Sequence, residues 1–284
     1  MYRYVVADVF TSTPLEGNPL AVVTDARGLP AQRMQQIARE FNLSETVFVL
    51  PAEEAEEAEE GADARVRIFT PAAELPFAGH PILGTAVVLG AAGGQETIRL
   101  ETGAGVIRID LTRQNGRIVS GRMRQPVPDW AAYERAGELL AALGVKSAEL
   151  PVEVYRNGPR HVYVALPSEQ EVAALQPDLG ALATLPAMGT VCFAGTGHRW
   201  KARNFAPSLG VPEDPATGSA AGPLAVHLAR HGRIPFGQEI EISQGAEIGR
   251  PSTLYARATG DGDRIDAVEV AGGAVVVARG ELDA

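Results

Sequence analysis

The sequence predicts an α+β fold of two related halves, in each of which strands surround one apolar helix. Thirty-one glycines and twenty prolines in 284 residues imply frequent turns, which favours short strands over long helices. The segments 79–89 and 214–230 are almost wholly apolar, and a helix that is apolar on every side must be buried. Phe69-Thr70-Pro71 precedes the first segment and Phe205-Ala206-Pro207 the second, so we expect one architecture to be repeated.

The first half alternates strands with two helices. Tyr2–Phe10 is rich in β-forming residues, and a turn at Glu16–Pro19 leads into the strand Leu20–Thr24. Pro30 opens a helix over Ala31–Asn42, whose apolar residues recur at helical spacing. Ser44–Leu50 is apolar on both faces, which indicates a strand buried on both sides. Further strands are expected over Arg65–Thr70, Thr97–Thr102, Val106–Leu111 and Val119–Arg124, the last two joined by an Asn115-Gly116 turn.

The second half repeats this alternation. A helix is expected over Glu134–Leu143, and the apolar helix that follows Asp214-Pro215 extends to about Arg230. Strands are expected near Glu153–Arg156, His161–Leu166, Met188–Phe193, Trp200–Phe205, Glu239–Ser243, Ser252–Ala258, Ile265–Val270 and Ala274–Arg279. We place the division at residues 1–126, which carry Glu45 and His80, and 127–284, which carry Asp214 and Ser219.

Charge and cysteine content exclude several functions. The formal net charge is −10 and no basic stripe is present, so nucleic acid is not an expected partner. Cys192 is the only cysteine, which rules out an intrachain disulfide and a thiolate metal cluster. The N-terminus lacks a signal pattern and Ile82–Gly94 is too short to span a bilayer, so we expect a cytoplasmic protein without a membrane partner. The acidic segment 53–60 has almost nothing to bury and is expected to be a solvated loop or frayed helix.

Glu45 is the first candidate for chemistry. It lies where a strand begins after a helix, and alternation places it on one face with Leu43, Val47 and Val49. A carboxyl group among such neighbours loses hydration, so its pKa is expected to rise toward neutrality. A group of that kind can both accept and return a proton. The alternative is an ordinary glutamate at an exposed strand end.

His80 is the second candidate, between Gly79 and Pro81 at the start of the first apolar helix. The positive end of the helix dipole favours the neutral imidazole there, which could hydrogen-bond a substrate. The alternative is a turn histidine satisfied by the backbone.

Asp214, Gly218 and Ser219 are candidates at the start of the second apolar helix. Small residues in a first helical turn let a ligand approach free backbone N–H groups, so a carboxylate could dock without an arginine. The alternative is that Asp214 only caps the helix.

Other polar residues are interpreted as structural. His227 and His231 are four residues apart, a spacing compatible with metal binding, but no HExxH pattern accompanies them. We interpret them as the C-terminal end of the helix and expect no metal site. Asn18 is assigned to its turn and Cys192 to packing.

Several motifs together resemble the PhzF family of phenazine biosynthesis. They are Glu16-Gly17-Asn18-Pro19-Leu20-Ala21-Val22, Asn42-Leu43-Ser44-Glu45-Thr46, Glu74-Leu75-Pro76-Phe77-Ala78-Gly79-His80-Pro81, Asn157-Gly158-Pro159-Arg160-His161-Val162, Asp214 to Gly222 and Gln244 to Ser252. The resemblance extends almost from end to end. It implies the diaminopimelate-epimerase-like fold, two pseudo-symmetric lobes each with a curled, mostly antiparallel sheet around a central helix. It also implies a homodimer, and a last strand, near 274–284, that returns to the first lobe.

The resemblance also implies an activity. It is a cofactor-independent isomerisation that moves a proton from C3 to C1 of trans-2,3-dihydro-3-hydroxyanthranilate. The family's catalytic carboxylate corresponds to Glu45, its substrate-contacting residues to His80 and Asp214, and its ligand-holding pair to Gly218 and Ser219. We further expect backbone N–H groups near Gly79 to bind the substrate carboxylate together with those of Gly218 and Ser219. The two-cysteine mechanism of diaminopimelate epimerase is impossible with one cysteine. Alternatives are a same-fold isomerase or epimerase acting on another small carboxylate, and a non-catalytic binding protein.

Overall fold

The computed structural model describes residues 1–52, 61–186 and 188–284, and the chain divides into two compact units. Unit 1 comprises Met1–Arg124 and Ala271–Ala284, and unit 2 comprises Gln125–Val270. The acidic segment 53–60 lies outside the described residues. The last strand, β18, pairs antiparallel with the first, β1, so unit 1 contains both ends of the chain.

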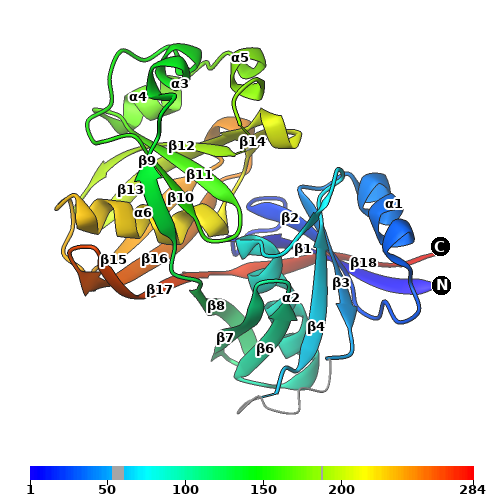
Figure 1. Ribbon diagram of the computed structural model, residues 1–284. Coiled ribbons are helices and arrows are strands. Elements are labelled where there is room, and N and C mark those ends of the chain that lie inside the picture. The colour runs from blue at the N-terminus through cyan, green and yellow to red at the C-terminus, as the bar shows by residue number, and fades with distance from the viewer. Residues whose placement is uncertain (53–60, 187) are drawn as a thin grey trace. The chain divides into compact units, whose positions relative to one another are not determined.

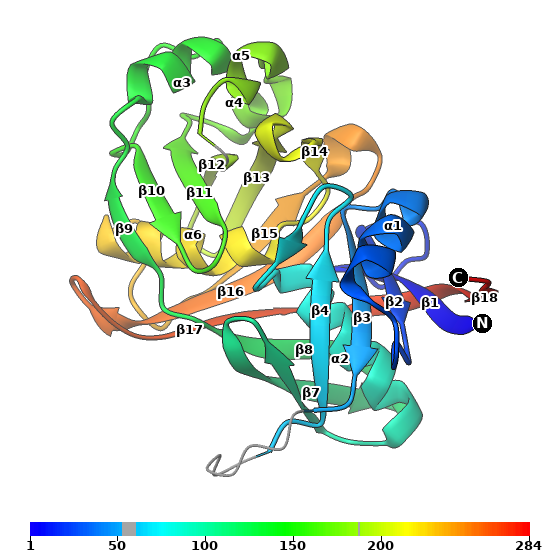
Figure 2. The ribbon, with the colours of Figure 1, turned by 45° about the vertical axis from the view of Figure 1, so that its right-hand side comes forward.

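Unit 1 is built around the helix α2 (Gly79–Gly93), which lies among its strands (Figures 1 and 2). Residues 79–88 of α2 are all buried, and the helix contacts β1, β2, β3, β6, β7 and β18. This confirms the expectation for a helix that is apolar on every side. The strands are β1 (Tyr2–Val9), β2 (Asn18–Val23), β3 (Glu45–Leu50), β4 (Ala64–Phe69), β5 (Glu74–Leu75), β6 (Thr97–Thr102), β7 (Gly105–Gln114), β8 (Arg117–Gln125) and β18 (Ala274–Leu282).

The helix α1 (Ala31–Phe41) covers another part of unit 1, as its periodicity predicts. It buries Met34, Ile37 and Ala38 against a cluster that includes Phe48 on β3, and it ends at Asn42 in the left-handed conformation. A left-handed residue is the usual way for a helix to stop, and asparagine tolerates it. The predicted hairpin turn between β7 and β8 is also present, since Asn115 and Gly116 both have positive φ.

Unit 2 is built around the helix α6 (Gly218–Arg230), which is buried from its first residue to Ala229. Three shorter helices, α3 (Ala136–Leu143), α4 (Glu169–Ala174) and α5 (Leu179–Ala183), cover a separate apolar cluster. Cys192 belongs to that cluster and is fully buried, which confirms its role in packing. The strands are β9 (Asp129–Ala132), β10 (Glu153–Arg156), β11 (Arg160–Ala165), β12 (Gly189–Thr196), β13 (Arg199–Ala206), β14 (Val211–Asp214), β15 (Glu239–Gln244), β16 (Ser252–Asp261) and β17 (Arg264–Gly272).

The strands of the two units pair in the same sequence of directions. In unit 1, β1–β2 is antiparallel, β2–β3 parallel, β3–β4 antiparallel, β4–β6 parallel and β6–β7 antiparallel. In unit 2, β10–β11, β11–β12, β12–β13, β13–β15 and β15–β16 repeat this order. The weak sequence echo between the halves therefore reflects a structural repeat.

The start of α6 differs from the sequence prediction. We expected the helix to begin at Asp214-Pro215, but Asp214 ends the strand β14 and the helix begins three residues after Pro215, at Gly218. Proline disfavours the helical conformation in the residue before it, which keeps Asp214 extended. Thr217 occupies the N-cap position instead.

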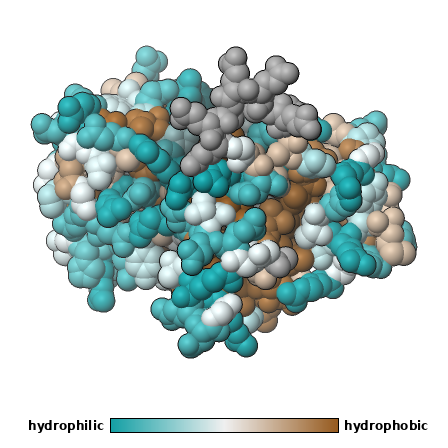
Figure 3. Space-filling model, turned by 90° about the horizontal axis from the view of Figure 1, so that it is seen from below, coloured by the Kyte–Doolittle hydropathy of each residue, from teal (hydrophilic) through white to brown (hydrophobic). Residues whose placement is uncertain are grey.

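The face shown in Figure 3 is hydrophilic over much of its area, with hydrophobic side chains gathered in a continuous area near its centre. Large apolar side chains that are exposed among the described residues include Leu15, Val106 and Val127. The helices within the described ranges are all too short or too polar to span a bilayer.

Candidate functional site

Glu45 lies at the first position of β3, at the edge of the core of unit 1. The strand is flanked on both sides, by β2 in parallel with Leu20 opposite Glu45 and by β4 in antiparallel. The next four residues of β3 are buried, whereas the Glu45 side chain is 15% exposed. The side chain is thus mostly withdrawn from solvent, and its Oε2 is buried.

His80 lies beside Glu45, at the second position of α2. Its Nε2 is 3.3 Å from the Glu45 Oε2, although the two atoms lack the alignment of a hydrogen bond. Burial lowers the pKa of His80 to about 3, and the positive end of the helix dipole acts in the same direction. The imidazole is therefore neutral at pH 7, and the contact is not a true ion pair. Catalytic hydrogen bonds are often long before a substrate is bound.

Asn18 determines which nitrogen of His80 carries the proton. The Asn18 Nδ2 donates to the His80 Nδ1 across 3.3 Å, so Nδ1 accepts and the single proton of the neutral ring is on Nε2, facing Glu45. The sequence assigned Asn18 only to its turn, but the structure places it fully buried at the start of β2. Its sequence context is that of an ordinary turn, and 62 residues separate it from His80, so no local pattern could reveal the contact.

In unit 2, the start of α6 presents free hydrogen-bond donors. Gly218 and Ser219 are its first two residues, and within the described part of the chain their N–H groups have no acceptor. The first bonded N–H groups are those of Ala220 and Ala221, which both donate to the Thr217 carbonyl. Such a pair of N–H groups at a helix start suits an anion.

Asp214 is held by Thr217 rather than capping the helix. The Thr217 hydroxyl accepts from the Asn204 Nδ2 at 2.8 Å and from the Gln244 Nε2 at 3.0 Å. Both lone pairs of the hydroxyl are thereby used, so its proton is donated to the Asp214 Oδ2, 2.5 Å away. This series of hydrogen bonds holds the Asp214 carboxylate in place as a hydrogen-bond acceptor.

Side chains also hold the first turn of α6, where an internal proline weakens the helix. Pro223 has no N–H to donate to the carbonyl of Ser219, four residues earlier. The Asn157 Nδ2 donates to that carbonyl instead, at 3.0 Å, and the Tyr163 hydroxyl donates to the next one, of Ala220, at 2.7 Å. The Asn157 contact thus replaces the hydrogen bond that Pro223 cannot make, and the Tyr163 contact adds a second link between α6 and the sheet.

The other end of α6 carries a cluster with metal-like composition. Glu153, His227 and His231 have ligand atoms within 4.8 Å of one another. However, the Arg230 Nη1 donates to the same carboxylate oxygen at 2.8 Å, and the Tyr155 hydroxyl donates to it at 2.9 Å. Burial alone would raise the pKa of Glu153, but these donors and the two histidines outweigh it and lower the pKa. We interpret the cluster as a charge-balanced hydrogen-bond network that anchors the C-terminal end of α6.

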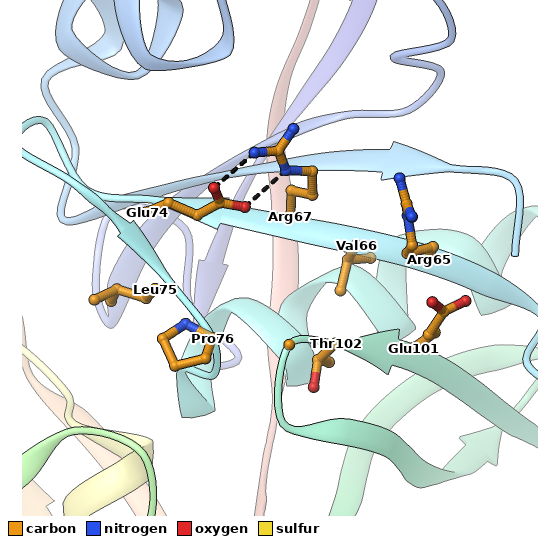
Figure 4. A pocket seen from close by; sticks show the side chains of 9 residues that line it. Arg65, Val66, Arg67, Glu74, Leu75, Pro76, Glu101 and Thr102 are labelled. Carbon is orange, nitrogen blue, oxygen red and sulfur yellow. Dashed lines mark hydrogen bonds and ion pairs between the residues drawn. The ribbon is translucent and has the colours of Figure 1, made fainter. Parts of the chain in front are cut away.

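A separate cavity of about 530 Å³ lies in unit 1 beside β4, between the part of that strand that pairs with β6 and the part that pairs with β5 (Figure 4). β4 pairs with β6 at Ala64 and Arg65 and with β5 at Ile68 and Phe69, so its middle borders the gap. Arg67 makes two hydrogen bonds to Glu74, at 2.7 and 2.6 Å, and Arg65 lies opposite Glu101. The charges that line this cavity are thus compensated, and neither Glu45 nor His80 lines it.

The sequence-predicted residues therefore form two described groups. In unit 1, Glu45, Gly79 and His80 lie together at the start of α2. In unit 2, Asp214, Gly218 and Ser219 lie together at the start of α6. Each group sits at the same place in the structural repeat, the N-terminus of the buried helix.

Comparison with known proteins fits this architecture. The sequence profile of the phenazine biosynthesis-like (PhzC-PhzF) proteins matches residues 7–280. The chain belongs to this family. It is 55% identical over 280 residues to the trans-2,3-dihydro-3-hydroxyanthranilate isomerase of Pseudomonas aeruginosa, a match that covers 99% of both chains.

Solved structures extend the likeness to the fold. A PhzF-family protein of Bacillus anthracis superposes with a TM-score of 0.84 at 27% identity, covering 99% of this chain and 98% of that one. A hydroxyproline epimerase of Agrobacterium vitis superposes with a TM-score of 0.63 at 14% identity, covering 98% and 91%. The second likeness concerns the fold alone. The expected family and the diaminopimelate-epimerase-like α+β fold are both confirmed.

Proposed function

We propose that the protein is an isomerase that moves a proton from C3 to C1 of trans-2,3-dihydro-3-hydroxyanthranilate. The proposal takes this substrate from the names of relatives that are 55% identical to the chain over 99% of its length. The observation that carries the proposal is the pair formed by the Glu45 carboxyl group and the neutral His80, 3.3 Å apart at the start of a buried helix.

Glu45 is the proton carrier in this proposal. As a carboxylate it removes the proton from C3, and the electron pair of the broken C3–H bond is delocalised through the conjugated double bonds toward C1. The same proton is then delivered to C1, and the resulting enol relaxes to the amino ketone. Only 15% of the Glu45 side chain is exposed, which limits exchange of the carried proton with solvent.

The other residues bind and orient the substrate. His80 presents its Nε2 proton and Asp214 its carboxylate, which suits the hydroxyl and amino substituents of the ring. The N–H groups of Gly79, Gly218 and Ser219 contribute to binding the carboxylate. The net charge of −10 repels an anion, so local donors of this kind are needed.

Substitution of Glu45 by Gln tests the proposal directly. Glutamine preserves the shape and removes the base, so we expect turnover of the dihydro-hydroxyanthranilate to fall by about 10²–10⁴-fold. Binding of the substrate should be largely retained. The reaction is followed by NMR in deuterated water, which reports both the new C1–H bond and any exchange.

Glu40→Gln is the matched control, because Glu40 is an exposed glutamate of the same unit. It should react like the unaltered protein. Full activity of Glu45→Gln would exclude Glu45 as the carrier, and absence of turnover by the unaltered protein would exclude this substrate.

The proposal includes three properties expected from the sequence: activity without a cofactor, a cytoplasmic location and a homodimeric state. Purified protein dialysed against a chelator should retain its turnover, and light scattering coupled to gel filtration should give twice the chain mass of 29.9 kDa.

A further inference from the structure

We propose that His161 is a positioning residue that turns the hydroxyl proton of Ser219 toward the carboxylate of the substrate. The inference rests on the proposed function and assigns a role to a buried histidine that the proton transfer itself does not use.

His161 lies within hydrogen-bond distance of Ser219. Its Nε2 is 3.0 Å from the Ser219 Oγ, although the two residues are 58 positions apart. Both residues are buried, with 4% and 6% of their surfaces exposed. Burial also lowers the pKa of His161 to about 4, so the imidazole is neutral and carries one proton.

The surroundings of the other nitrogen indicate where that proton resides. Nδ1 is buried and has no hydrogen-bond partner within the described residues. A buried N–H group without an acceptor is rarer in proteins than a buried acceptor without a donor. The proton therefore belongs on Nε2, and the imidazole donates to the Ser219 Oγ.

This tautomer leaves the serine proton for a ligand. A hydroxyl that accepts from His161 directs its own O–H elsewhere. Ser219 lies in the first turn of α6, beside the free N–H groups of Gly218 and of Ser219 itself. The result is a set of three donors at a helix start, which matches the acceptor sites of a carboxylate.

The repeat shows that unit 2 makes room for this histidine. In the β11–β12 ladder His161 lies opposite Gly189, and in the corresponding β2–β3 ladder of unit 1 Leu20 lies opposite Glu45. A Cβ atom on Gly189 would be 2.5 Å from the His161 Nδ1. The strand position that carries the acid in unit 1 is thus a glycine in unit 2, and an imidazole fills the space. This favours a binding role for His161 over a second proton carrier.

A double-mutant cycle tests whether His161 acts on the substrate through Ser219. We expect His161→Leu to raise the KM for the dihydro-hydroxyanthranilate about 10- to 100-fold, the loss expected for one hydrogen bond to a charged group, with a smaller effect on kcat. In a Ser219→Ala background the same substitution should change KM less than twofold. His161→Gln, which keeps a side-chain N–H, should recover part of the loss. Equal effects of His161→Leu with and without Ser219 would overturn the proposal.

Val164→Ala is the matched control. Val164 is a fully buried residue of the same strand that packs in the separate apolar cluster with Leu139 and Val172, so its truncation should lower thermal stability without raising KM. An equal rise in KM for Val164→Ala and His161→Leu would indicate a merely structural role for His161.

Two readouts do not depend on turnover. Nitrogen-15 NMR of the imidazole should show the proton on Nε2, and a proton on Nδ1 would overturn the proposal. The second readout is titration with 3-hydroxyanthranilate, an aromatic carboxylate that cannot isomerise. It should bind more weakly to His161→Leu than to the unaltered protein, and equal binding would contradict the proposed role of His161. If the unaltered protein fails to turn over the dihydro-hydroxyanthranilate, the proposed function falls while these two measurements still decide the role of His161.

Discussion

Substitution of Gly189 by Ala should disturb two sets of hydrogen bonds at the start of α6, the one from His161 to Ser219 and those that link Asn204, Thr217 and Asp214. The added Cβ would be 2.5 Å from the His161 Nδ1 and 2.7 Å from the Asn204 Oδ1, distances that real Cβ atoms essentially never show. Both neighbours are buried side chains held by partners on or next to α6, so neither can move away freely. Overpacking of this kind costs about 1–3 kcal/mol, which corresponds to a fall in Tm of roughly 2–5 °C for a chain of this size.

The same substitution should weaken substrate binding, because His161 contacts Ser219 and Asn204 contacts Thr217, which in turn holds Asp214. Differential scanning calorimetry and steady-state kinetics measure the two effects. Gly137→Ala is the control, because Gly137 lies inside α3 with open space around its Cβ position. Alanine there should be neutral or stabilising by about 0.5–1 kcal/mol. If Gly189→Ala matches Gly137→Ala in Tm and KM, the two side chains do not converge on Gly189 as described.

The remaining predictions concern acid stability and the first turn of α6. Because burial holds the pKa of His80 at about 3 and that of His161 at about 4, the unfolded chain binds more protons than the folded one below pH 6.5. Each histidine should therefore reduce the free energy of unfolding by about 1.4 kcal/mol per pH unit as pH falls from 6.5 toward 4, with no contribution above this range. Urea unfolding at pH 7 and pH 5 should show a shallower pH dependence for His161→Gln, and an unchanged slope would contradict the burial argument. Asn157→Ala should lower the free energy of unfolding by about 1–3 kcal/mol, because it leaves the Ser219 carbonyl unpaired. The loss should be smaller in a Pro223→Ala background, where residue 223 regains an N–H for that carbonyl. Equal losses in the two backgrounds, measured by thermal unfolding, would show that Asn157 does not compensate for Pro223.

Most of the secondary structure could be predicted from the sequence, because its patterns are local. The periodicity of Ala31–Asn42 and the β-rich run Ser44–Leu50 correspond to α1 and β3 within a residue at each end. The start of α6 could not be predicted in this way. Asp214-Pro215 resembles a helix start by composition, but Thr217 and its partners Asn204 and Gln244 move the start to Gly218.

The candidate site was only partly predictable for a related reason. Glu45 and His80 are conspicuous in their own segments, as an acid in an apolar strand and a histidine at a helix start. Asn18 and His161 are not, since their roles depend on contacts with residues 62 and 58 positions away. Each contact joins a strand to the start of a buried helix, Asn18 of β2 to His80 of α2 and His161 of β11 to Ser219 of α6, and a single sequence does not reveal how a distant helix packs on a strand.

The asymmetry of the repeat bears on the kind of proton transfer that this fold supports here. Two-base epimerisation needs one proton carrier in each half of the repeat. Unit 1 has a carboxyl group at the start of β3, whereas the corresponding strand of unit 2 begins with Gly189, and the only cysteine, Cys192, is fully buried within that strand. Asp214 already accepts a hydrogen bond from the Thr217 hydroxyl, which favours a role in orienting a substrate over one in removing its proton. One carrier that takes a proton and returns it suits a repeat in which the second copy has become a set of hydrogen-bond donors.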